Sequence, residues 1–234
     1  MTRPDLSPTG IRFQNIEKRY GGLWALRRVT LDIAAGECVV VAGRNGSGKT
    51  TLLRIAAHLV RPSFGEISFV APGTNGKLAA PRTGFVAHAT MAYDELTAEE
   101  NLLLFARLQD IFQPAARVEG LLREVGLYER RASLVRTFSR GMRQRVAIAR
   151  ALLLEPSVLF LDEPATGLDP QGVSWLAETL RKLRDAGCTM LMSLHGESEI
   201  SSLATRAIRL EAGSVAADTR TGANFRSILT FADA

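Results

Sequence analysis

The chain has 234 residues, of which 46% are hydrophobic and 23% are charged, so it is long enough for one sizeable core and a smaller subdomain. Its formal net charge of +5 suits a phosphorylated ligand, a nucleic acid or an anionic membrane surface without choosing among them. No run approaches the roughly 18 apolar residues that a membrane helix needs, and the polar stretch 1–10 lacks the apolar core of a signal peptide. If a membrane matters for this protein, another chain is expected to span it.

The first seventy residues predict strands and turns, with one helix. Residues 1–10 read as a polar arm, and a helix is expected from Lys49 to about Leu59, where the sequence RPSFG would end it. Cys38 and Cys188 each lie in apolar, strand-like sequence, which favours buried free thiols over a metal site. Apolar runs bounded by glycine-containing turns predict strands at 11–16, 27–33, 37–43 and 66–70.

Between about Tyr93 and Arg150 the pattern becomes mainly helical. Thr97, with Glu100 three residues later, predicts a capping box at the start of the first helix. In the third helix the apolar residues share one face, so Arg143 and Arg150 can face solvent. The expected helices cover 97–109, 116–127 and 139–155.

From Pro156 onward, strands and helices alternate. This order predicts a parallel sheet covered by helices, in an α/β fold into which the block 93–150 is inserted as a helical subdomain. We expect a polar arm at 1–10, one domain at 11–213 with an N-terminal antiparallel β-subdomain, and a tail at 214–234. The alternating elements are expected at 157–162, 170–187, 188–194, 197–205 and 206–213.

A phosphate-binding loop is predicted at Gly43 to Thr50. GRNGSGKT follows an apolar strand and opens a helix, the context that G-x-x-x-x-G-K-[ST] requires, whereas a plain glycine-rich turn needs no such pattern. The glycines let backbone N–H groups face the phosphates, Lys49 would reach the β- and γ-phosphates, and the Thr50 hydroxyl would ligate Mg²⁺. The expected nucleotide-binding residues here are Gly43, Arg44, Asn45, Gly46, Ser47, Gly48, Lys49, Thr50 and Thr51.

Two adjacent acids end the buried strand VLFLDE. Consecutive side chains leave a strand in opposite directions, so the two carboxylates suit different tasks. Asp162 fits a carboxylate near Mg²⁺, and Glu163 could polarise the attacking water. An apolar strand with terminal acids is common by itself, and the phosphate loop is what favours the functional interpretation.

A short motif before the third predicted helix carries a family resemblance. FSRGMRQR, which precedes VAIARALLLEPSVLFLDEP, resembles the L-S-G-G-Q signature of the ATP-binding cassette (ABC) ATPases. The Ser139 hydroxyl, the Gly141 N–H and the helix N-terminus would present donors to a phosphate. In the family this motif serves the nucleotide of the opposite subunit, so the resemblance implies a dimer that sandwiches two ATP molecules. The sequence departs from the motif at Phe138, Arg140 and Met142.

The resemblance covers nearly the whole chain and implies further site residues. Tyr20 stands where the family stacks an aromatic ring on adenine, and Asp169 stands in the loop that meets the partner subunit. His195 matches a histidine that contacts the γ-phosphate. His88 stands eight residues before Leu96, where the family usually has a Gln that links Mg²⁺ to the helical block. Because Mg²⁺ prefers oxygen ligands, we expect His88 to hydrogen-bond a Mg²⁺-bound or attacking water, with a satisfied strand-end histidine as the alternative.

A lone cassette with a short helical block resembles a transporter subunit. Residues 51–137 separate the two phosphate motifs without the sustained heptads of a coiled coil, unlike the repair and chromosome ATPases of the superfamily. His88 before LTAEENL is similar to the ATP-binding subunit of the bacterial haem exporter of cytochrome c biogenesis. Other small exporters, such as multidrug or lipid systems, share the general pattern.

The resemblance implies an ATP hydrolase that uses ATP and Mg²⁺, pairs head to tail with a second copy and drives export through a separate transmembrane permease at the cytoplasmic face of a bacterial inner membrane. Lys49, Glu163 and His195 would be the catalytic residues, and nucleic acid is not an expected partner. Two alternatives stay open: a soluble regulatory or nucleic-acid-linked ATPase, which the basic balance permits, and a nucleotide-binding subunit that does not hydrolyse ATP.

Overall fold

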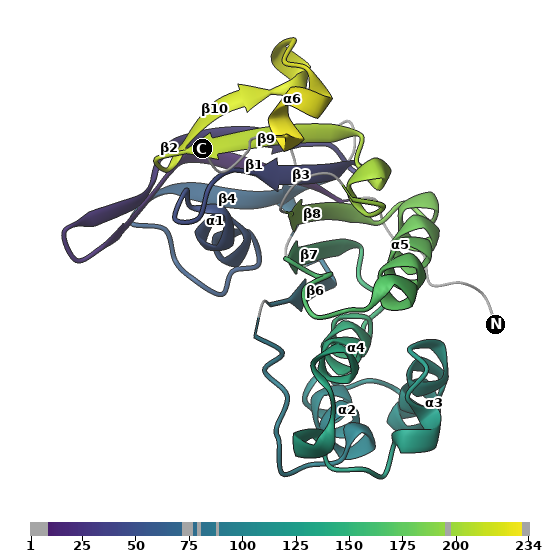
Figure 1. Cartoon of the computed structure of the whole chain (residues 1–234). Coiled ribbons are helices and arrows are strands. Elements are labelled where there is room, and N and C mark those ends of the chain that lie inside the picture. The colour runs from purple at the N-terminus through teal and green to yellow at the C-terminus, as the bar shows by residue number, and fades with distance from the viewer. Residues whose placement is uncertain (1–8, 72–76, 79–80, 88, 195–197, 231–234) are drawn as a thin grey trace.

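The computed structural model describes residues 9–71, 77–78, 81–87, 89–194 and 198–230 of the chain. In this part of the chain the strands form two sheets (Figure 1). One sheet is antiparallel, with the strand order β2-β1-β4-β5. Its strands are β1 (Gly10–Tyr20), β2 (Leu23–Ile33), β4 (Phe64–Val70) and β5 (Lys77–Leu78).

The second sheet has the order β10-β9-β3-β8-β7-β6 and is parallel except for β10. The predicted α/β fold with a mainly parallel sheet and an N-terminal antiparallel part is therefore confirmed. Its strands are β3 (Cys38–Ala42), β6 (Thr83–Val86), β7 (Val158–Asp162), β8 (Thr189–Ser193), β9 (Arg206–Glu211) and β10 (Ser214–Asp218).

Strand β3 shows why the parallel sheet forms the centre of the fold. All five of its residues are buried, as expected for a strand covered on both faces. Because side chains alternate along a strand, Val39 and Val41 join a core shared with α1 and the antiparallel sheet, whereas Val40 joins the core beneath the other helices. Cys38 and Cys188 are buried free thiols, as predicted, and burial raises the pKa of each to about 12.

The helices lie on both faces of the parallel sheet, and α2, α3 and α4 gather beyond β6 at one end of the molecule (Figure 1). The predicted capping box is confirmed, because the Glu100 N–H donates to Thr97 Oγ1 at 3.1 Å and the Thr97 N–H donates to Glu100 Oε2 at 2.8 Å. The helices are α1 (Lys49–Ala56), α2 (Ala98–Leu108), α3 (Pro114–Glu124), α4 (Arg140–Ala151), α5 (Pro170–Asp185) and α6 (Phe225–Leu229), with 3₁₀ turns at Tyr128–Arg130, Val135–Thr137, Ser201–Leu203 and Thr219–Thr221.

The prediction of a helix at 197–205 is wrong for the described residues 198–205. Only a single 3₁₀ turn forms, Ser201–Leu203. The Ser198 N–H donates to Ser201 Oγ at 2.8 Å, and the Ser201 N–H donates to Ser198 Oγ at 3.2 Å. Serine hydroxyls that bind nearby backbone groups compete with helical hydrogen bonds, which explains the difference.

Arg150 does not face solvent, although the helical pattern allows it to. Its guanidinium lies 5.0 Å from the centre of the Phe105 ring, and its Nη1 donates to the Met91 carbonyl at 2.9 Å. Burial lowers the pKa of Arg150 below its ordinary value. The helical face that could meet water therefore contacts the segment that follows β6.

The segment expected as a tail contributes β10 and α6 to the fold. Ile228 and Leu229 of α6 are buried in the core beneath the helices. The buried Arg206 of β9 donates to both carboxylate oxygens of Asp218, at 2.8 and 2.5 Å. Burial alone would raise the pKa of Asp218, but the hydrogen bonds from Arg206 and the Arg220 N–H, with the charges of both arginines, outweigh it and lower that pKa. Arg220 also pairs with Glu37 at 2.8 Å, so this network ties the segment to the sheet.

Among the residues that the structure describes, there is no helix both long and apolar enough to cross a membrane.

Candidate functional site

The loop predicted to bind phosphate, Gly43 to Thr50, runs from the end of β3 into the first residues of α1. Lys49 is buried, and its Nζ donates to the carbonyls of Gly43 and Arg44, at 2.6 and 3.1 Å. The ammonium group is thus held in the concave side of the loop. No side chain of the described residues caps the start of α1 at Gly48, which leaves the first N–H groups of the helix to an external acceptor.

Gly48 is required at its position for two independent reasons. Its φ of 107° lies in the left-handed region, and an added Cβ would lie 2.5 Å from the Ala25 carbonyl oxygen and 2.8 Å from Leu26 Cδ2. Gly46 has a φ of 80° with nothing within 4 Å of an added Cβ, so it shares the backbone constraint without the clash. The strand β2 therefore presses directly against the loop.

We expect Gly48→Ala to lower the free energy of unfolding by about 2–4 kcal/mol, because strain and overpacking add. Gly46→Ala is the matched control and should cost only about 1 kcal/mol, from strain alone. Urea denaturation followed by circular dichroism measures both. Equal losses in the two variants would contradict the assigned contact with β2.

The two residues predicted to serve a metal lie side by side. Thr50 Oγ1 donates to Asp162 Oδ1 at 3.1 Å, across the junction between α1 and the end of β7. Ser193 Oγ, at the end of β8, donates to the same carboxylate oxygen at 2.7 Å. Asp162 is 1% exposed, and its Oδ2 is buried without a hydrogen-bond partner among the described residues.

That unpartnered oxygen is the observation that fits Mg²⁺. A buried carboxylate oxygen without a donor is costly unless a cation or an ordered water approaches it. Mg²⁺ prefers hard oxygen ligands, and the Thr50 hydroxyl and Asp162 carboxylate supply them. The donor set present here therefore suits this ion, with Thr50 and Asp162 as the groups that would hold it.

Glu163 lies just beyond the end of β7. Its φ of 51° is in the left-handed region, which is uncommon for a side-chain-bearing residue. Its N–H donates to the Ser193 carbonyl at 3.2 Å and to Ser193 Oγ at 3.1 Å. The side chains of Asp162 and Glu163 therefore point in different directions, because of both strand alternation and the left-handed backbone at Glu163. Ser193 contacts both residues.

Ser139 and Gly141 are not brought to the phosphate loop of their own chain. Helix α1 packs on β7, β8 and β2, whereas α4 packs on β6, α2 and α3. Ser139 caps α4, since its hydroxyl accepts from the Met142 N–H at 3.3 Å, and it is exposed. An added Cβ at Gly141 would lie 3.2 Å from the Gly167 carbonyl, so this helix end touches the loop before α5. Asp169, exposed in that loop, caps α5 by accepting from the Gly172 N–H at 2.8 Å.

The remaining predicted residues are less closely tied to the site. Tyr20 ends β1 with 49% of its surface exposed, and Lys18 Nζ lies 5.0 Å from the centre of its ring. Arg44 and Asn45 are exposed at the tip of the phosphate loop, and Thr51 is partly buried in α1. His88 and His195 lie outside the described residues.

Two positioning residues were missed by sequence reasoning. Ser193 reaches both acids because β8 lies next to β7, with Ser193 opposite Asp162 in the register. Gln144, 3% exposed on α4, donates from Nε2 to the Pro164 carbonyl at 2.9 Å, directly after Glu163. The sequence did offer a signal for Gln144, because it is a polar residue among the apolar residues of the buried face of α4.

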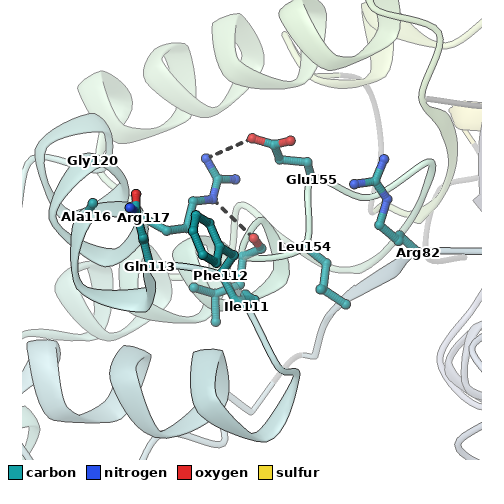
Figure 2. A pocket seen from close by; sticks show the side chains of 10 residues that line it. Arg82, Ile111, Phe112, Gln113, Ala116, Arg117, Gly120, Leu154 and Glu155 are labelled. Carbon is teal, nitrogen blue, oxygen red and sulfur yellow. Dashed lines mark hydrogen bonds and ion pairs between the residues drawn. The ribbon is translucent and has the colours of Figure 1, made fainter. Parts of the chain in front are cut away.

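A cavity of about 490 Å³ lies in the helical region and contains none of the predicted site residues (Figure 2). Arg117 spans it, donating to the Leu153 carbonyl at 3.1 Å and pairing with Glu155 at 3.3 Å. These contacts cap the last turn of α4 and leave the exposed Phe112 at the edge. The cavity is a structural feature of the α3–α4 junction rather than the nucleotide site.

Known proteins resemble this chain over most of its length. A family model described as ABC transporter matches residues 26–166. The chain is 37% identical over 217 residues to the daunorubicin resistance ATP-binding protein DrrA3 of Streptomyces coeruleorubidus, covering 91% of this chain and 69% of the relative. It is 37% identical to the Nod factor export ATP-binding protein I of Burkholderia orbicola, covering 89% of this chain and 70% of the relative. It is 38% identical to the ABC transporter ATP-binding protein NatA of Bacillus subtilis, covering 87% of this chain and 84% of the relative.

Solved structures give the same result. The dimeric structure of MJ0796, a bacterial ABC transporter cassette, superposes with a TM-score of 0.80 at 30% identity, covering 89% of this chain and 97% of that chain. A dimeric post-hydrolysis state of MJ0796, bound to ADP and Pi, gives a TM-score of 0.78 at the same identity and coverage.

Proposed function

Because this chain belongs to the ABC transporter family, as an ATP-hydrolysing, ATP-binding subunit, we propose that it drives export through a separate membrane subunit. The observation that carries the nucleotide chemistry is the contact between Thr50 and Asp162, beside the buried Lys49. The adjacent Lys49 and Thr50 meet Asp162, which lies more than a hundred residues away in the sequence, and a phosphoryl-transfer site requires such a convergence of groups.

The phosphates of ATP would lie across the N-terminal end of α1. The loop N–H groups and Lys49 neutralise their charge, while the exposed Arg44 and Asn45 border the entrance. Tyr20 would stack on the adenine. Mg²⁺, held by Thr50 and Asp162, supplies further charge neutralisation when it is bound. Glu163 would orient and polarise the attacking water, and Ser193 positions it through the backbone N–H.

Two copies would complete two nucleotide sites. Dimeric relatives support a self-dimer, and the separation of Ser139 from its own phosphate loop leaves that residue available to a partner copy. Ser139 and Gly141 of one copy would donate to the nucleotide held by the other, with Asp169 at the contact between them. His195 and His88 are proposed on resemblance alone, as contacts to the γ-phosphate and to a water.

The cargo is best sought among small exported molecules other than haem. The expectation of haem export finds no support, because the similar proteins are named for daunorubicin resistance, Nod factor export and NatA. The haem-exporter interpretation of His88 therefore has no support among these relatives. Export across the bacterial inner membrane, with this subunit on the cytoplasmic face, remains part of the proposal.

The helical region offers an apolar surface for the membrane partner. Leu108 and Phe112, at the end of α2 and just beyond it, are 70% and 86% exposed. The two residues are four positions apart in the chain, and neighbouring exposed apolar residues are typical of protein contacts. These two residues would contact the permease.

Co-isolation tests this proposal. A tagged chain should bring down a polytopic membrane protein from detergent-solubilised membranes of its own host, and Leu108→Asp with Phe112→Asp should reduce the recovered amount by about tenfold. The matched control is Phe64→Asp, which charges a 65% exposed residue of the antiparallel sheet and should leave recovery unchanged. Recovery of no membrane protein with the unmodified chain would overturn the transport assignment, while ATP hydrolysis by the same sample would leave the enzyme assignment standing.

A further inference from the structure

The segment 89–96 forms neither a strand nor a helix, and the buried side chain of Asn101 binds its backbone. Asn101 is 1% exposed; its Oδ1 accepts from the Tyr93 N–H at 2.8 Å, and its Nδ2 donates to the carbonyls of Tyr93 and Thr97, at 2.9 and 3.0 Å. The Nδ2 group also donates to the Leu96 carbonyl at 3.3 Å, and a buried amide that contacts four backbone groups fixes the local path of the chain. The segment between β6 and α2 is therefore a defined unit of structure, called here the 89–96 segment.

The chain just before α4 pairs with this segment. The Arg136 N–H donates to the Asp94 carbonyl at 3.1 Å, and the Val135 N–H donates to the Leu96 carbonyl at 2.9 Å. Thr97 and Leu134 form an isolated antiparallel bridge. The residues that lead into Ser139 thus take their position from the 89–96 segment.

Arg143 closes the connection. Its Nη1 pairs with Asp94 Oδ1 at 2.5 Å, while its Nη2 donates to the Arg136 carbonyl at 3.1 Å and its Nε to the Phe138 carbonyl at 3.4 Å. One guanidinium therefore joins the 89–96 segment to the two ends of the turn that immediately precedes Ser139. The rigid, planar fork of arginine allows these three contacts at once, which a lysine could not reproduce.

We infer that Arg143, through its pair with Asp94, is a positioning residue that sets the turn at Ser139 according to the position of the 89–96 segment. The ion pair is only half-buried, with side-chain exposures of 28% and 51%. An ion pair of this exposure contributes little to global stability. The ion pair instead fixes the position of a turn, because the other donors of Arg143 bind the turn that presents Ser139 and the N-terminus of α4. Through them, a shift of the 89–96 segment changes how well this chain presents donors to a phosphate.

Hydrogen–deuterium exchange of the nucleotide-free chain tests the connection directly. Asp94→Asn and Arg143→Gln should each speed exchange of the amides in 134–143 by roughly threefold to tenfold. The matched control is Glu119→Gln, which breaks an ion pair to Arg123 of 2.8 Å in the same helical region, with a carboxylate that is 49% exposed. That control should leave exchange in 134–143 unchanged.

A double variant and enzyme kinetics separate positioning from a merely structural role. If the pair acts as a unit, Asp94→Asn combined with Arg143→Gln should speed exchange of the amides in 134–143 no more than Arg143→Gln alone. ATP binding to the isolated chain should be unchanged, while kcat falls by roughly threefold to tenfold because Ser139 is misplaced.

Three results would each overturn the inference. They are unchanged exchange in 134–143 in the single variants, additive increases in that exchange in the double variant, and a weaker ATP affinity with unchanged kcat. The exchange measurement requires no ATP turnover, so its result is independent of whether the proposed dimeric mechanism is correct. Arg143→Lys should not restore the exchange rate, since it lacks the arginine fork.

Discussion

Replacing Glu163 by Gln is expected to lower ATP turnover by a factor on the order of 10² to 10⁴, the range that a general base contributes. The variant keeps the size and left-handed backbone of the residue, and Ser193 still accepts its N–H, so the loop should hold its shape. An amide lacks the carboxylate charge that polarises water. ATP should therefore bind and promote pairing of two chains, but phosphate should not be released at a normal rate.

Phosphate release and size-exclusion chromatography with ATP measure the two halves of this result. Glu178→Gln is the control, since that carboxylate is exposed on α5 and pairs with Arg181 away from the site. Normal turnover by Glu163→Gln would refute the assigned role of this carboxylate. Loss of ATP binding would indicate instead that Glu163 holds the loop in place.

Replacing Lys49 by Met is expected to weaken ATP binding by about 10-fold to 100-fold, the loss expected for a hydrogen bond to a charged group. The ammonium group is fixed by the carbonyls of Gly43 and Arg44, so it needs little reordering to meet a phosphate. Methionine fills a similar volume without the charge. Titration with a fluorescent ATP analogue measures the affinity.

Lys182→Met is the control for net charge, because Lys182 is 73% exposed on α5. It should bind the analogue as the unmodified chain does. Lys49→Arg should not recover full affinity, since a planar guanidinium does not fit where a compact ammonium is held by two carbonyls. Equal binding by Lys49→Met and Lys182→Met would exclude Lys49 from the phosphate site.

The sequence predicted those parts of the site that depend on local pattern. GRNGSGKT and VLFLDE each carry their geometry within a few residues, because a glycine-rich turn opens a helix and a buried strand ends in acids. The Thr97 capping box is local in the same way. The contact between Thr50 and Asp162 also needs the strand order, because β8 lies between β3 and β7 and α1 packs across to β7.

Contacts that depend on strand order or on helix packing could not be predicted. Ser193 lies beside Asp162 only because β8 neighbours β7, and no spacing along the chain reveals that pairing. The helical pattern allowed Arg150 to face solvent, yet the 89–96 segment covers that face of α4. Around Ser198 and Ser201, local side-chain hydrogen bonds override the apolar pattern that suggested a helix.

The network around Arg206 bears on how the chain can be shortened. Arg206 is 4% exposed and depends on Asp218 for both of its short carboxylate contacts. A chain cut after Gly213 would bury that guanidinium without its main counter-ion, which is far more costly than losing a surface pair. The cut would also remove β10 from β9 and expose an unpaired strand edge, a template for intermolecular β pairing and aggregation. Engineered fusions are therefore better joined beyond α6 than at the end of β9.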